Sequence, residues 1–128
     1  MRTTVVLGVA GALFVSLALL GQEHPGTKVR GELKVQDVEM AIMDHIEQDE
    51  MLQNRFMVYD EKKEIARVLT FERFHTVNQL DDGSFFVCVD FEGQNKDMLD
   101  LDFHIVETAE GLKLSKLVIH KVNGKSRL

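Results

Sequence analysis

The stretches FFVCVDF at residues 85–91 and LDLDFHIV at residues 99–106 decide the fold of this 128-residue chain. In both, large apolar residues alternate with smaller or polar residues along the whole stretch. Side chains of a β-strand point alternately to the two faces of a sheet, so this alternation predicts two half-buried strands. We therefore expect a sheet with one apolar face and one polar face.

Three further strands and one helix are expected around this pair. The expected strands are residues 56–59, 65–74 and 112–122, separated by turns rich in charge and glycine. Residues 35–52 carry apolar side chains at helical spacing, with acidic residues on the wetter side. One helix packed on four or five antiparallel strands predicts an α+β domain, in the order of cystatin-like and NTF2-like architectures.

The chain begins with Arg2 and an apolar run over residues 5–20, which is the layout of an export signal. Two fates remain open for this segment. Ser16 and Ala18 offer the small residues of a cleavage site, whereas the run falls just short of the length of an uncleaved membrane anchor. The expected organisation is an export segment at residues 1–21, a linker at 22–33 and one α+β domain at 34–128.

The net charge of −6 argues against nucleic-acid binding by bulk electrostatics. Membrane contact is expected only through the N-terminal segment. Cys88 is the only cysteine, so the chain forms no internal disulfide and no cysteine follows the apolar run to take a lipid. A mild basic stripe near the C-terminus is either solvated charge or a dock for an acidic partner. It comprises Lys113, Lys116, Lys121, Lys125 and Arg127.

The polar face of the expected sheet carries residues that can bind a metal. Alternation places there Cys88, Asp90, Asp100, Asp102 and His104, with His75 and His120 at the border. Thiolate, imidazole and carboxylate suit zinc or another divalent metal, and the aspartates alone would suit calcium. The plainer alternative is a solvated face, where charged residues belong. The candidate metal ligands are Cys88, Asp90, Asp102, His75 and His120.

Catalysis is the least favoured use of the same residues. A nucleophilic Cys88 would need an imidazole within hydrogen-bond reach, and several histidines compete for that place. A carboxylate pair of Asp90 and Asp102 would suit glycoside hydrolysis, but a small sheet offers little cleft for a sugar. We therefore expect no catalytic residue and no cofactor other than such a metal, and we rank a small hydrolase last.

Several segments together form a recognisable pattern: Tyr59-Asp60, Phe74-His75, FVCVDF at 86–91, DLDF at 100–103 and IHKVNGK at 119–125. This pattern, which covers residues 35–127, resembles that of small exported bacterial proteins with no assigned function. The resemblance implies an envelope location and a single α+β domain, and it implies no activity, cofactor or catalytic residue. His104 stands where the pattern would place an aromatic or apolar residue, which weakens it as a ligand.

The sequence thus favours a non-enzymatic binding or interaction module of the bacterial cell envelope. The module would lie in the periplasm or stay tethered to the inner membrane. The first alternative is a periplasmic metal-binding protein. Because open sheet edges are templates for association, the expected partner is a second copy of the chain or another envelope protein.

Overall fold

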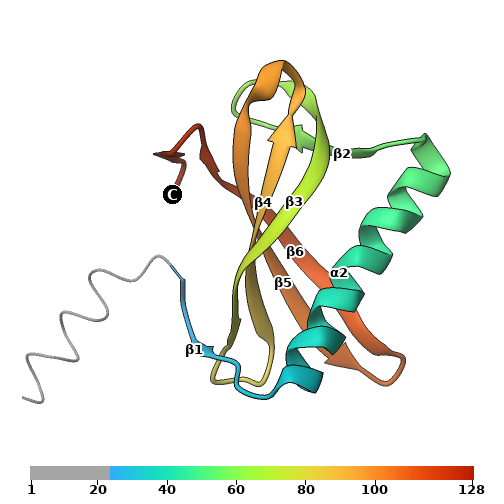
Figure 1. The fold of residues 1–128 in the computed structure, drawn as a ribbon, viewed down its shortest axis with the longest axis vertical. Helices are drawn as coiled ribbons and strands as arrows, with labels where there is room; N and C mark the ends of the chain where they lie inside the picture. Colours follow the sequence, from blue (N-terminus) through green and yellow to red (C-terminus); the bar gives the residue numbers. More distant parts are fainter. Residues whose placement is uncertain (1–23) are drawn as a thin grey trace, which may run out of the picture.

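The computed structural model describes residues 24–128 and shows one long helix laid against a curled antiparallel sheet (Figure 1). The α+β class predicted from the sequence is confirmed, and the helix and five longer strands lie where the patterns placed them. The elements are β1 (Thr27–Lys28), α2 (Glu32–Gln53), β2 (Phe56–Asp60), β3 (Ile65–Gln79), β4 (Phe85–Gly93), β5 (Met98–Thr108), β6 (Gly111–Val122) and β7 (Lys125–Ser126), with a 3-10 turn at Gln94–Lys96.

The sheet of the described residues has seven strands, more than the four or five predicted. Its order is β1-β3-β4-β5-β6-β7, and β2 pairs with the other half of β3. The strands that the sequence analysis missed, β1 and β7, have two residues each. Two residues are too few for alternation to reveal a strand, so only the tertiary pairing identifies them.

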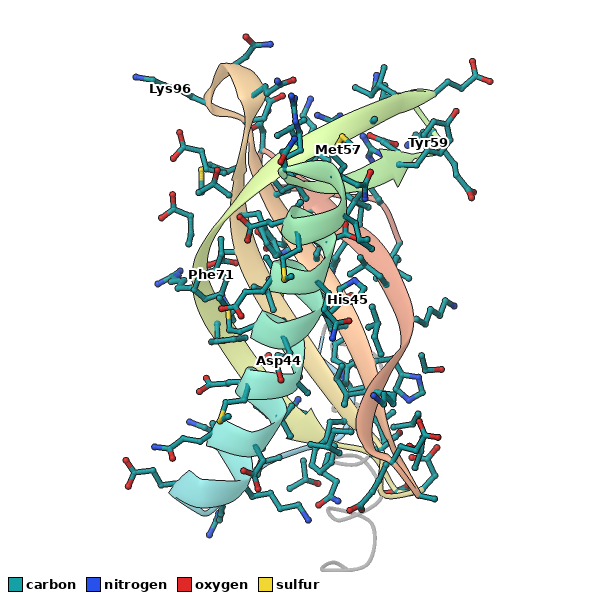
Figure 2. All side chains as sticks on the ribbon, turned by 90° about the vertical axis from the view of Figure 1, so that its right-hand side faces the viewer. Asp44, His45, Met57, Tyr59, Phe71 and Lys96 are labelled. Carbon is teal, nitrogen blue, oxygen red and sulfur yellow. The ribbon has the colours of Figure 1, made fainter. Side chains whose placement is uncertain are left out.

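α2 packs on the sheet through one row of side chains, Val38, Ile42 and Ile46, which are almost completely buried. Facing them are the alternating apolar residues of β4 and β5, namely Phe85, Val87, Val89, Phe91, Leu99, Leu101, Phe103 and Ile105. Figure 2 shows α2 along the face of the sheet, with Asp44 and His45 on the helix. Burying one large apolar side chain contributes about 1.5–3 kcal/mol, so this interface forms the main core.

The last turn of α2 differs from the expected apolar stripe. Met51 and Leu52, placed on that stripe by their spacing, are each 84% exposed. This turn stands clear of the sheet (Figure 1). Asn54 then ends the helix in the left-handed conformation, with φ 65°, and the chain turns into β2.

The predicted linker, residues 22–33, is built into the fold over most of its described part. β1 pairs with the end of β3, and Gly26 lies so close to it that a Cβ atom would stand 2.5 Å from the Gln79 carbonyl oxygen. α2 begins at Glu32, inside the predicted linker. Proline and glycine mark turns as well as linkers, which explains the difference.

The predicted export segment, residues 1–21, lies outside the described residues. Among residues 24–128, no helix combines the length and the apolar character needed to cross a membrane.

Candidate functional site

The sheet face turned away from α2 is closed to solvent at its centre. Cys88 is completely buried, Asp102 is 4% exposed and His120 is 2% exposed. His24 and Pro25 lie over this face, because the Asn78 side-chain amide donates hydrogen bonds of 3.1 Å to their carbonyl oxygens. The expectation of a solvated face is therefore wrong at its centre, since the segment interpreted as a linker covers it.

Strand register brings Cys88 and Asp102 together as directly paired residues of β4 and β5. His120 joins them through a bulge in β6. Ile119 pairs with Leu101 and Lys121 pairs with Asp100, which leaves His120 between them without a partner on β5. A bulge re-aims a side chain, and His120 Nδ1 lies 3.2 Å from Asp102 Oδ1.

His24 completes this group from outside the long strands. The donor atoms of His24, Cys88 and His120 all lie within 4.8 Å of one another. The His24 and His120 rings meet edge to face, with centroids 6.0 Å apart. We call His24, Cys88, Asp102 and His120 the inner cluster. His24 was not among the predicted ligands because it belongs to no periodic segment, and its only signal in the sequence is a histidine beside Pro25.

Asp90 and His75, the other two predicted ligands, lie at the edge of the inner cluster. Donor atoms of Cys88, Asp90 and Asp100 also fall within 4.8 Å of one another. Asp90 already has a cationic partner, because Arg73 Nε donates to its carboxylate at 2.6 Å. Asp90 is therefore less available to a metal than the inner cluster is.

His75 occupies a bulge of β3, as His120 does of β6. Phe74 pairs with Val89 and Thr76 pairs with Cys88, which leaves His75 unpaired in the ladder. Its Nδ1 lies 3.8 Å from the Asp90 carboxylate, and its ring centroid lies 5.3 Å from that of His24. Its side chain is 42% exposed, so His75 borders the inner cluster from the solvent side.

His104 is directed away from this group, consistent with its weaker candidacy. Its Nε2 lies 2.8 Å from the Ser84 hydroxyl oxygen, beside the turn that joins β3 and β4. Ser84 in turn bonds to the Asp82 carboxylate through both its backbone N–H and its hydroxyl. His104 thus belongs to a local turn network.

Negative charge gathers around Cys88. Burial, together with the carboxylates of Asp102, Asp100 and Asp90, raises the pKa of the Cys88 thiol to about 12. Burial also raises the pKa of Asp102, although His120 opposes this shift. A thiol that stays protonated is a poor nucleophile, which argues against a cysteine hydrolase.

The same electrostatics favour a bound cation. A divalent ion beside Cys88 and Asp102 would lower both pKa values by stabilising the thiolate and the carboxylate. Thiolate, imidazole and carboxylate are the ligands that zinc takes. In a tetrahedral zinc site, bond lengths of about 2.0–2.3 Å place neighbouring donor atoms roughly 3.3–3.8 Å apart. The donor atoms of His24, Cys88 and His120, which lie within 4.8 Å of one another, are close to that spacing.

No protein-family model matches this chain, and no characterised protein or solved structure matches it significantly.

Proposed function

We propose that this protein is a non-enzymatic binding module of the bacterial cell envelope that takes a divalent transition metal, zinc or copper, at the inner cluster. The observation that carries the proposal is the convergence of His24, Cys88 and His120, with donor atoms within 4.8 Å of one another; Cys88 and His120 are buried and His24 is half-buried. The neighbouring aspartates add negative charge that a cation would balance.

Each residue of the inner cluster has a separate role in this proposal. Cys88 as thiolate and the imidazoles of His24 and His120 bind the metal directly. Asp102 accepts a hydrogen bond from His120 Nδ1, which orients the ring and leaves Nε2 for the metal. Such carboxylate–histidine–metal arrangements are common around protein-bound zinc. Among the predicted ligands, Asp90 and His75 have a surrounding rather than a binding role.

The envelope location is part of the proposal, in the periplasm or at the surface of the inner membrane. It is supported by Arg2 and the apolar run over residues 5–20, which have the layout of an export segment. His24 follows that run closely in sequence. In a chain that keeps the segment, metal binding would therefore take place next to the membrane.

The helix-then-sheet order supports the finer architecture that we propose, cystatin-like or NTF2-like. The proposed partner is a second copy of the chain or another envelope protein. It is supported by the edge of β6, where only Lys121 and Val122 pair with β7 among the described residues. Open edges of this kind accept a further strand.

Zinc titration of the full chain, followed by calorimetry and elemental analysis, tests the metal site. We expect one zinc or copper ion per chain, with binding lost in Cys88→Ser and strongly weakened in His24→Asn. His45→Gln is the matched control, because this histidine lies on α2 against Phe56 and outside the inner cluster. A wild-type chain that retains no stoichiometric metal, or equal binding by Cys88→Ser, would refute the proposal. Binding of calcium alone would instead indicate the aspartates.

A further inference from the structure

A cleft lined mainly by cations lies where the turn between β2 and β3 meets the C-terminal strand β7. Its volume is about 470 Å³, which falls in the range of about 300–1,000 Å³ that is usual for small-molecule sites. Five of its nine lining residues are cations: Lys62, Lys63, Arg67, Lys125 and Arg127. In a chain with a net charge of −6, this concentration reverses the sign locally. We call it the basic cleft.

The two arginines of the basic cleft are held in place by the buried carboxylate of Asp60. Arg127 donates to both Asp60 oxygens, from Nη1 at 2.7 Å and from Nη2 at 3.1 Å. Arg67 Nε donates to the same carboxylate at 2.8 Å. The side chain of Arg67 is only 11% exposed and that of Arg127 only 12%. Guanidinium groups fixed in this way lose little conformational freedom when an anion binds.

The lysines supply charge that no described carboxylate balances. Lys62, Lys63 and Lys125 are exposed, and none of them forms an ion pair with any residue from 24 to 128. Asp97 is the only acidic residue that lines the cleft, and its carboxylate already accepts hydrogen bonds from Arg67 and Asn123. Like charges around one hollow repel each other, and natural proteins keep such conflicts mainly at functional sites.

Neutral donors and further charge surround these cations. The Ser126 hydroxyl oxygen accepts the Leu128 N–H at 3.2 Å, so its hydrogen is directed elsewhere and can be donated to a ligand. A neighbouring hollow of about 440 Å³ shares Lys62 and Arg127 with the basic cleft and adds Lys116. Asp60 and Glu61 also line that neighbouring hollow, so the positive charge is concentrated in the basic cleft.

We infer that the basic cleft binds a phosphate group. A phosphate monoester carries about −1.5 to −2 charges at pH 7 and three acceptor oxygens, which matches three lysines beside two fixed guanidinium groups. Free phosphate, a phosphorylated small molecule and a phospholipid headgroup share this chemistry. No residue of the inner cluster lines the basic cleft, so this site is independent of the proposed metal site.

Thermal unfolding of the full chain at increasing concentrations of inorganic phosphate tests this inference, with sodium chloride at equal ionic strength as reference. The melting temperature should rise with phosphate and not with chloride. In Lys62→Glu/Lys125→Glu the apparent phosphate affinity should fall about tenfold, because two exposed cations of the cleft become anions. Lys28→Glu/Lys113→Glu, an equal charge change at two exposed lysines that line neither hollow, should have little effect.

Vesicles distinguish the source of the phosphate. The full chain is sedimented with vesicles of phosphatidylcholine and phosphatidylglycerol, and wild type is compared with Lys62→Glu/Lys125→Glu so that binding by the N-terminal segment cancels. A difference there identifies a headgroup as a ligand, and a response to inorganic phosphate alone identifies a soluble one. If the double variant matches wild type in both experiments, the basic cleft is not a phosphate site.

Discussion

Asp60 and Asp102 are both almost completely buried, at 1% and 4% exposure, yet their surroundings shift their pKa values in opposite directions. Hydrogen bonds from Arg127 and Arg67 hold the pKa of Asp60 far below its usual value, although burial alone would raise it. Asp102 has one imidazole partner, His120, and there burial dominates. The number of donors that surround the carboxylate therefore decides the sign of the shift.

This difference separates the structural role of Asp60, which joins two parts of the chain, from the proposed metal-binding role of the group around Asp102. Asp60 joins the turn after β2 to the chain's last residues, and its charge is fully balanced by two guanidinium groups and by the backbone N–H groups of Lys62 and Lys63. Asp102 and Cys88 lack such balance. A cation bound beside Asp102 would stabilise its buried carboxylate, which has few partners in the fold. A cation bound beside Asp60 would add little stability, because the two guanidinium groups already neutralise that carboxylate.

The largest effect is expected when the joint is broken. Asp60→Asn should lower the free energy of unfolding by about 3–5 kcal/mol, because it leaves two largely buried guanidinium groups without their counter-ion. Urea unfolding at neutral pH measures this. Asp97→Asn is the control: its carboxylate is 35% exposed and lies 3.4 Å from Arg67, so its loss should be below about 1 kcal/mol. Equal losses in the two variants would contradict the comparison.

Metal bound at the inner cluster, which contains Asp102, should stabilise the folded protein. Zinc at a hundredfold excess over its Kd should raise the free energy of unfolding of wild type by about 2.7 kcal/mol. Cys88→Ser should show almost none of this gain, because it removes the thiolate, and Asp60→Asn should keep it. Unfolding with and without zinc measures the difference. A gain that survives in Cys88→Ser would place the metal elsewhere.

Acid should weaken the joint at Asp60. The folded pKa of Asp60 is lowered, so its stabilisation is present above the unfolded value of about 4 and is lost as the pH falls through the folded value. Wild type should therefore approach the stability of Asp60→Asn as the pH is lowered below about 4. Unfolding curves at successive acidic pH values would show this, and a difference that does not depend on pH would rule it out.

The smallest effect is expected at Asp102 in the metal-free protein. Its raised pKa means that its ionised form does not stabilise the fold. Asp102→Asn, which keeps an acceptor for His120, should therefore change the free energy of unfolding by no more than about 1 kcal/mol. The same variant should bind zinc more weakly, as loss of a residue that orients a ligand does. Calorimetry and urea unfolding on one preparation measure both quantities.

Local pattern was sufficient for most of the fold. The alternation in residues 85–91 and 99–106 predicted both the strands and the face that meets α2, because the period of a strand is a property of the backbone. The same alternation placed Cys88 and Asp102 on one face. It could not show that their pairing is direct, because register depends on turns and bulges elsewhere in the sheet.

Three features were decided only by the tertiary structure. His24 reaches Cys88 because Asn78 holds His24 and Pro25 over the sheet, a contact between residues far apart in sequence. His120 faces Asp102 because a bulge interrupts the alternation of β6. Arg127 contacts Asp60 although the two are 67 residues apart in sequence, and this contact gathers scattered lysines and arginines into one cleft. The sequence by itself thus determined which residues point to which face, since that follows from backbone geometry. Only the folded chain decided which of them meet and how their charges balance, since both depend on long-range packing and burial.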